Sequence, residues 1–204
     1  MLALIDYGMG NIKSVYKAFE FVKAPVTLVE NKDQFDAMDN VKGIILPGVG
    51  AFGDCMKNLD SRGFISVIKE NIDKKMPYLG ICLGFQILFG SSEESPGISG
   101  LEIFKGTNRR FSEELKVPHM GWNRIIKVND NVFLNNIADK RHFYFVHSYY
   151  VDNDDKMIIS TVTDYGISFT SSICKDKLFA CQFHPEKSQD GGLNIIRNFV
   201  SQCL

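Results

Sequence analysis

A cysteine and a histidine–glutamate pair are the residues of this chain whose types and positions suit nucleophilic chemistry. Cys82 ends an apolar run in the stretch GICLGFQ, with a glycine two residues before it and another two after it. His184 and Glu186 belong to HPE, which follows the apolar run LFACQF. A thiol becomes a nucleophile when an imidazole takes its proton, and a carboxylate can orient that imidazole and stabilise its charged form.

The glycines around Cys82 have the spacing of a nucleophile elbow, G-x-S-x-G, with sulfur in place of oxygen. In that turn the backbone of the nucleophile is strained and a strand passes close to a helix, so small flanking residues avoid a clash. The helix N-terminus favours a thiolate, and its backbone N–H groups can hold an oxyanion. The alternative is that Cys82 is a small core residue beside an ordinary turn.

Four histidines are available as the base, and His184 has the most suitable context. An apolar strand is expected to run directly into it, and Pro185 stiffens the turn that follows. Glu186 can then point the same way as His184. A strand-terminal histidine near a surface glutamate is common, so HPE alone leaves its role open. The other histidines are expected in a loop or at strand ends: His119, His142 and His147.

The glycine-rich stretch ILPGVGAFGD also suits chemistry. Gly48, Gly50 and Gly53 match the dinucleotide-binding pattern G-x-G-x-x-G. Two features argue against that function: Pro47 and Gly48 are expected to form a tight turn before the helix begins, and the next strand ends at Cys82 without an acidic residue for a ribose. No Gly-Lys pair is present for a P-loop. PGVG is better explained as flexible backbone that can present an N–H to an oxyanion.

The elements that position these motifs alternate in the first half of the chain and are mostly strands in the second. Apolar runs at 2–6, 26–30, 42–48 and 76–81 predict strands, and helical spacing is expected at 10–22, 64–73 and 83–90. This alternation indicates a parallel sheet covered on both faces. Segments between 109 and 183 predict antiparallel strands, and 192–204 a final helix. The predicted fold is therefore three-layer α/β, with a mostly parallel mixed sheet and an antiparallel extension. We expect 91–100 to be a mobile loop or a surface turn.

The composition excludes several classes of function. The 204 residues are 45% hydrophobic and 23% charged with a net charge of −1, so no basic excess points to nucleic acid or an anionic membrane. No apolar run reaches the roughly 18 residues of a membrane span, and the N-terminus does not resemble a secretory signal. The five cysteines are scattered, which fits reduced thiols in a cytoplasm and no zinc site. We expect no metal and no cofactor.

Taken together, the cysteine elbow, PGVG and HPE resemble the class I (triad) glutamine amidotransferases. More narrowly, the chain is similar over essentially its full length to the glutaminase-subunit family of imidazole glycerol phosphate synthase. The narrower motifs are YGMGN, PGVGAFG, PHMGWN and FVHSYY. The resemblance implies one three-layer, flavodoxin-like domain over residues 1–204. Departures are small: Phe85 replaces the usual Met, and Cys174 and Cys181 are unusual but look structural.

The resemblance implies roles for the reacting groups. Cys82 would attack the side-chain amide of glutamine to form a thioester, His184 would shuttle protons, and Glu186 would hold His184. The backbone N–H of Leu83 and one from 49–50 would form the oxyanion hole, and PGVG would reorient before donating. The positions implied to bind glutamine are Gln86, Glu94, Ser148 and Tyr149, and the oxyanion segment is Val49 and Gly50.

The resemblance also implies a partner. A (β/α)8 cyclase subunit would form a heterodimer with this chain, receive ammonia through a tunnel, and make imidazole glycerol phosphate and an aminoimidazole carboxamide ribotide in histidine biosynthesis. His147 would be structural. Trp122 is expected to anchor the interface, with a buried core position as the alternative. The implied docking residues are Asn11, Trp122, Tyr144 and Lys187.

Three other functions remain open from the sequence. A paralogue of these glutaminase subunits would use the same chemistry to supply ammonia for amidino sugars of surface polysaccharides. A non-catalytic subunit would keep the fold and bind a partner, although the intact Cys82, His184 and Glu186 argue against it. A cysteine hydrolase or peptidase on a related sheet commonly has its histidine soon after the cysteine, whereas here it lies about a hundred residues later.

Overall fold

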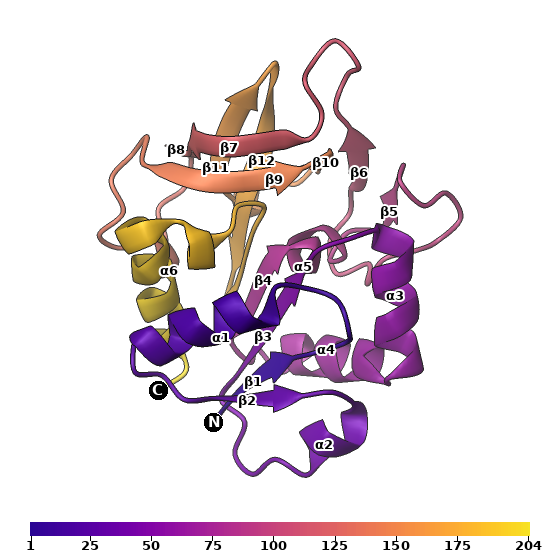
Figure 1. The fold of residues 1–204 in the computed structure, drawn as a ribbon, viewed down its shortest axis with the longest axis vertical. Helices are drawn as coiled ribbons and strands as arrows, with labels where there is room; N and C mark the ends of the chain where they lie inside the picture. The colour runs from indigo at the N-terminus through magenta and orange to yellow at the C-terminus, as the bar shows by residue number, and fades with distance from the viewer.

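The computed structural model describes residues 1–204. Strands and helices alternate along the N-terminal part, as the apolar runs predict (Figure 1). In chain order these elements are β1 (Leu2–Ile5), α1 (Ile12–Phe21), β2 (Val26–Val29), α2 (Lys32–Asp36), β3 (Gly43–Gly48), α3 (Phe52–Ser61), α4 (Phe64–Asp73), β4 (Tyr78–Cys82) and α5 (Leu83–Gln86).

Strands dominate the rest of the chain until a C-terminal helix closes it (Figure 1). The elements are β5 (Ser91–Ser92), β6 (Thr107–Arg110), β7 (His119–Arg124), β8 (Ile126–Lys127), η1 (Val132–Leu134), β9 (His142–His147), β10 (Tyr149–Asp152), η2 (Lys156–Ile158), β11 (Ile159–Tyr165), β12 (Ile167–Lys175), β13 (Leu178–Cys181), η3 (Pro185–Lys187) and α6 (Gln189–Gln202).

The main sheet has eleven strands, and its central path runs β2-β1-β3-β4-β13-β12-β10-β6-β5. The first five of these strands are parallel, while β12, β10 and β6 continue the sheet through antiparallel pairs. β11 and β8 extend it beside β12, and β7 pairs with β9 in a separate two-stranded ribbon. The carboxyl ends of β3 and β4 are neighbours because Gly48 pairs with Cys82, which brings PGVG to the elbow.

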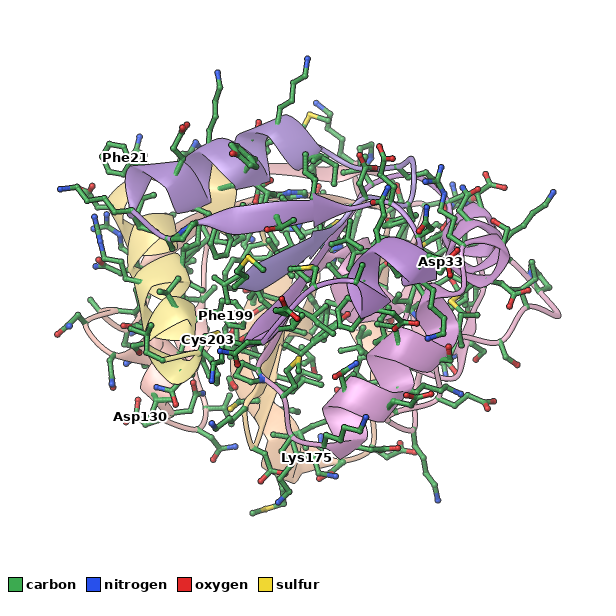
Figure 2. All side chains as sticks on the ribbon, turned by 90° about the horizontal axis from the view of Figure 1, so that it is seen from below. Phe21, Asp33, Asp130, Lys175, Phe199 and Cys203 are labelled. Carbon is green, nitrogen blue, oxygen red and sulfur yellow. The ribbon has the colours of Figure 1, made fainter.

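Helices cover both faces of the parallel strands, so successive strand residues enter two separate cores. Ile44 and Leu46 of β3 pack with α3 and α4, whereas Ile45 between them packs with α1 and α6. Figure 2 shows Phe199 of α6 and Cys203, just after that helix, turned toward the strands, while Phe21 lies at the outer edge of α1. Strands buried on both faces are nearly continuous apolar runs, which explains the composition of 42–48 and 76–81.

Four local expectations were wrong in detail. Pro47 and Gly48 are the last residues of β3 rather than a turn, since they pair with Ile81 and Cys82. His119 begins strand β7 rather than lying in a loop, because it pairs with His147. His184 follows β13 by three residues instead of coming directly after that strand.

The fourth difference concerns the helix predicted at 83–90, of which only α5 (Leu83–Gln86) forms. The next carbonyl groups bond to a distant loop: Ile87 O accepts from Leu101 N–H at 2.7 Å, and Leu88 O from Ile103 N–H at 2.9 Å. Continuing the helix would take these carbonyls away from that loop. No helix of the molecule is both long enough and apolar enough to cross a membrane.

Candidate active site

Cys82 occupies a strained turn between β4 and α5. Its backbone has φ 54° and ψ −103°, a conformation that costs free energy for any residue with a side chain. A Cβ on Gly84 would overlap the Leu46 carbonyl oxygen, and a Cβ on Gly80 would lie 2.5 Å from the Gly84 carbonyl oxygen. Both glycines are therefore required by close backbone packing, as the G-x-C-x-G spacing predicts.

His184 and Glu186 form a buried pair in the turn after β13. The imidazole Nδ1 lies 2.8 Å from Glu186 Oε1, and the side chains are 2% and 1% exposed. Burial by itself lowers the pKa of His184, but Coulombic attraction to Cys82, followed by the hydrogen bond and charge of Glu186, raises that pKa to about 10. His184 Nε2 has no aligned acceptor, so its interaction with the Cys82 sulfur is mainly electrostatic. The three predicted triad residues are thus brought together.

The HPE turn is held on strand β9 by its backbone. His184 N–H donates to Tyr144 O at 2.9 Å, and Tyr144 N–H donates to Ser188 Oγ at 3.0 Å. Ser188 Oγ donates in turn to His184 O at 2.6 Å. Gly192 allows the turn to pack closely against α6, because a Cβ at this position would overlap the Pro185 carbonyl oxygen. These contacts fix the backbone of the turn that carries the imidazole, and the sequence motif did not reveal that the Ser188 hydroxyl takes part in them.

A cavity of about 290 Å³ opens beside the cysteine. Its volume suits a single small polar molecule. Seven of the residues that line it are Val49, Gly50, Cys82, Leu83, Gln86, Glu94 and Ser148. The cavity therefore gathers the predicted nucleophile, both predicted oxyanion segments and three of the four predicted glutamine-binding residues. No group of three or more histidine, cysteine, aspartate or glutamate side chains is placed to hold a metal ion.

The predicted glutamine-binding residues differ in their contacts. Gln86 Nε2 donates to Tyr149 O and to Gln182 Oε1, both at 2.9 Å, so the Gln86 side chain is fixed. Glu94 Oε2 accepts from the N–H of Phe52 at 2.7 Å, which caps α3. Ser148 lines the cavity, whereas Tyr149 acts through its carbonyl and does not line it. The segment 91–100, expected as a mobile loop or surface turn, is thus tied to the start of α3.

Gln182 is the buried polar residue that the motif analysis missed. It lies between Cys181 and Phe183, is fully buried, and its Nε2 donates toward Cys82 Sγ at 3.5 Å. The available signal was one amide within the apolar run LFACQF, since a fully buried amide needs hydrogen-bond partners. Nothing in the sequence could say that one of these partners is the cysteine a hundred residues earlier.

Two further histidines form a buried pair beneath the β7–β9 ribbon. His119 Nδ1 and His147 Nε2 are 2.9 Å apart, His147 Nδ1 is 2.8 Å from Tyr149 O, and Asn123 Nδ2 is 3.2 Å from His119 Nε2. Since Tyr149 O only accepts, His147 Nδ1 carries the proton and His119 Nδ1 donates to His147. Burial lowers the pKa of His119 to about 4 and that of His147 to about 3. His147 is therefore a neutral hydrogen-bonded link.

Three of the four predicted docking residues form one exposed cluster. Trp122 is 48% exposed, which excludes the buried alternative, and its ring lies 6.1 Å from that of Tyr144. Lys187 Nζ lies 5.7 Å from the Tyr144 ring centre. Met120, 61% exposed on the same face of β7, joins them although the sequence did not single it out. Asn11 is the N-cap of α1.

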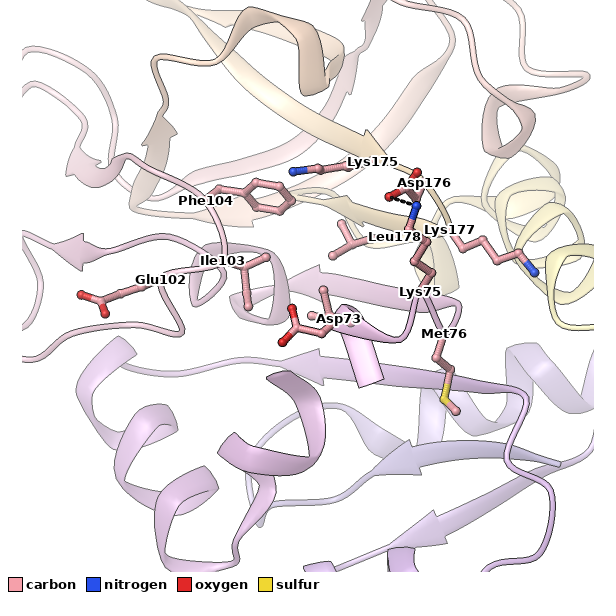
Figure 3. Close-up of a pocket in the computed structure, with 11 residues that line it drawn as sticks. Asp73, Lys75, Met76, Glu102, Ile103, Phe104, Lys175, Asp176, Lys177 and Leu178 are labelled. Carbon is pink, nitrogen blue, oxygen red and sulfur yellow. Dashed lines mark ion pairs between the residues drawn. The ribbon is translucent and has the colours of Figure 1, made fainter. Parts of the chain in front are cut away.

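A second cavity, of about 330 Å³, lies at the opposite ends of β4 and β13 (Figure 3). An ion pair of 3.5 Å joins Lys75 and Asp176 at its edge, and Phe104 and Lys175 face each other across 5.7 Å. These charged groups are solvent-exposed side chains and neither a cysteine nor a histidine lines the cavity. It has no part in the chemistry around Cys82.

Comparison with known proteins identifies the family of this chain. Residues 3–203 match the family described as Glutamine amidotransferase class-I. The chain therefore belongs to the class-I glutamine amidotransferases, a class of enzymes. Within that class it is 47% identical over 200 residues to imidazole glycerol phosphate synthase subunit HisH of Methanocaldococcus jannaschii, with 98% of each chain covered. It is 46% identical to HisH of Aquifex aeolicus, over 96% of this chain and 94% of that one.

Solved structures with low sequence identity share the fold. The structure of PurLQS from Thermotoga maritima matches with a TM-score of 0.77 at 19% identity, over 98% of this chain and 97% of that one. A crystal structure of a glutamine amidotransferase matches with a TM-score of 0.76 at 15% identity, over 98% of each chain. The predicted family and the predicted three-layer α/β fold are confirmed.

Proposed function

We propose that this chain is the glutaminase subunit of an imidazole glycerol phosphate synthase, acting in histidine biosynthesis. It hydrolyses L-glutamine to glutamate and ammonia and passes the ammonia to a cyclase subunit. The observation that carries this proposal is Cys82 on a strained elbow, facing a cavity beside the buried His184–Glu186 pair. Relatives named HisH at 42% to 47% identity over nearly the whole chain support the pathway.

The geometry suggests the following steps. The Cys82 thiolate attacks the side-chain amide carbon of glutamine, and the resulting oxyanion is held by N–H groups of Leu83 and of 49–50. The C–N bond breaks as protonated His184 gives its proton to the leaving nitrogen, which departs as ammonia. Water then attacks the thioester while His184 takes a proton from it, and glutamate leaves with Cys82 free. Glu186 stabilises the imidazolium whenever His184 carries the proton.

Substrate binding follows from the free polar atoms of the cavity. Gln86 uses both N–H groups within the protein and accepts no hydrogen bond, so its Oε1 is available to the substrate. Glu94 has one oxygen bonded to Phe52 N–H and the other free for the α-amino group of glutamine. Ser148, which lines the cavity, would bind the α-carboxylate, and Tyr149 would act through Gln86, which its carbonyl holds.

The exposed cluster of Met120, Trp122, Tyr144 and Lys187 would be the docking face for a (β/α)8 cyclase subunit in a heterodimer. Val146 lines the cavity, and its carbonyl lies 4.0 Å from Cys82 Sγ. On the ribbon, Val146 pairs with the exposed Met120, so the face that carries Trp122 lies next to the reacting sulfur. A partner seated there would receive ammonia over a short path. Five unpaired cysteines fit a cytoplasmic location.

The test measures glutamate and ammonia release from glutamine, by the chain alone and with a histidine-pathway cyclase subunit and its ribotide substrate. Strong stimulation by this partner, abolished by Cys82→Ala, is expected. Activity that ignores the partner would instead favour the paralogue that supplies amidino-sugar synthesis. No activity in any condition, with Cys82 unreactive toward a glutamine-like electrophile, would make the chain a non-catalytic binding subunit.

A further inference from the structure

The amide of Gln182 lies between the nucleophile and the residue predicted to bind the substrate. Its Nε2 is 3.5 Å from Cys82 Sγ, and its Oε1 is 2.9 Å from Gln86 Nε2. The side chain is fully buried and follows directly on β13, two residues before His184. A buried amide with no exposed surface is held by its hydrogen bonds, so these two contacts fix its position.

The surrounding groups determine which end of the amide faces the sulfur. Tyr149 O can only accept, so the Gln86 atom bonded to it is the nitrogen. That same nitrogen lies against Gln182, which must therefore present its oxygen to Gln86. The Gln182 nitrogen is left facing Cys82 Sγ. The orientation is thus set by a backbone carbonyl, through Gln86, and does not depend on the assignment of either amide alone.

We propose that Gln182 is a positioning residue of the glutaminase reaction, which directs an N–H at the Cys82 sulfur and holds Gln86 toward the substrate. This inference rests on the proposed function. An N–H donor binds a thiolate more strongly than a thiol, since hydrogen bonds to charged acceptors are stronger. Gln182 therefore stabilises the attacking form of Cys82 together with the imidazolium of His184.

The same amide links nucleophile and substrate. Because Gln86 donates to Gln182 and to Tyr149 O, its own oxygen is turned to the cavity. Losing the Gln182 oxygen would free one N–H of Gln86 and loosen the side chain that meets glutamine. A change at Gln182 is therefore expected to lower kcat through the sulfur and to raise KM through Gln86, whereas Gln86→Met should act mainly on KM.

The first experiment measures the pH midpoint of Cys82 alkylation by iodoacetamide, followed by mass spectrometry of the peptide that contains it. Gln182→Met keeps the size of the side chain and removes both hydrogen-bonding ends. We expect the midpoint to rise by about one to two pH units, the size of a lost hydrogen bond to a charged group. In the complex with the cyclase subunit, kcat/KM for glutamine should fall about 10- to 100-fold.

Two variants keep the test decisive. Thr161→Val removes a buried hydroxyl, bonded to Ser171 and Ser172, from β11 outside the cavity, and should leave the alkylation midpoint unchanged. Gln182→Asn keeps an amide but shortens its reach, so it should shift the midpoint in the same direction as Gln182→Met and serves if that variant does not fold.

An unchanged midpoint in a folded Gln182→Met or Gln182→Asn protein would overturn the proposal. The alkylation measurement needs no turnover, so it decides the contact between Gln182 and Cys82 even if the chain releases no ammonia with this partner. Failure of the glutaminase assay with a shifted midpoint would count against the proposed function alone.

Discussion

His184 and His147 are both buried imidazoles whose Nδ1 atom is held by a hydrogen bond, yet their pKa values move in opposite directions. Burial lowers the pKa of both, but Cys82 and Glu186 more than compensate at His184 and raise its pKa to about 10. At His147 burial dominates, and Tyr149 O and the neighbouring His119 leave the pKa at about 3. Negatively charged neighbours favour the charged form of His184, while burial without such a neighbour keeps His147 uncharged.

The largest expected effect comes from removing the negative charge that distinguishes the first site. Glu186→Gln keeps an oxygen that can accept from His184 Nδ1 but no longer stabilises the imidazolium. We expect kcat for glutamine hydrolysis in the complex to fall by about 10³- to 10⁴-fold, as when the carboxylate of a related triad is neutralised. Glu114→Gln makes the same change at an exposed position and is the control. A loss below tenfold would mean that position, not charge, is what Glu186 supplies.

At the second site the cost of a change falls on folding. His147→Leu leaves the His119 Nδ1–H without an acceptor in the interior. The free energy of unfolding should decrease by about 2–3 kcal/mol, measured by urea denaturation at pH 7.5. His142→Leu, on the exposed end of the same strand, should change it by less than about 0.5 kcal/mol. Equal effects of the two variants would show that the buried pair adds no stability.

The two sites also predict how stability depends on pH. The pKa values of His119 and His147 are lowered, so below pH 6.5 the unfolded chain binds protons that the folded protein does not. Stability should fall as the pH drops from 6.5 toward 4, by about 1.4 kcal/mol per pH unit for each histidine that stays neutral. The pKa of His184 is raised, so its contribution is complete below pH 6.5 and is lost progressively as the pH rises from 6.5 to about 10.

Denaturant unfolding at several pH values between 4.5 and 7.5 measures this slope. A double variant, His119→Gln with His147→Asn, removes the two titrating imidazoles and places a non-titrating amide at each position. Its unfolding free energy should change less steeply with pH than that of the wild type. If the two slopes coincide, protons taken up elsewhere account for the acid sensitivity.

The smallest effect is expected from a charge that adjoins the triad in sequence but lies outside it. Lys187 follows Glu186, is exposed, and rests on the Tyr144 ring. Lys187→Gln removes a cation–π contact that is worth about 0.5–1 kcal/mol at exposed sites, and urea denaturation should show a loss of that order. Lys17→Gln, an exposed lysine of α1, gives the baseline for removing a charge alone. A loss as large as that of His147→Leu would contradict the contrast between buried and exposed sites.

Local motifs were readable from the sequence because their chemistry is contained in a few adjacent residues. The elbow glycines indicate close backbone packing, and the HPE motif places His184 two residues before the carboxylate of Glu186. Burial on both faces likewise made the parallel strands visible as apolar runs. The pairing of β3 with β4 was not visible, so Gly48 was assigned to a turn although it is the last residue of a strand.

What the sequence did not reveal depends on contacts between distant residues. Gln182 reaches Cys82 across a hundred positions, His119 meets His147 across two strands, and Glu94 caps a helix that begins at Phe52. Taken alone, each of these polar residues is typical of a surface loop or of an isolated buried polar position. The hydrogen-bond partner of each residue is known only once the fold brings the two residues together.

The buried histidine pair gives this molecule a built-in reporter. Its two Nδ1–H protons are shielded from water, so they can exchange only when the ribbon opens, and each should give a separate, slowly exchanging resonance in the NMR spectrum. Asn123, at the outer end of the chain of donors, adjoins Trp122, and Tyr149 O at the inner end is shared with Gln86. The chemical shifts of these two protons should therefore change when a partner protein binds at Trp122 and when a ligand binds in the cavity, without any label near the Cys82 sulfur.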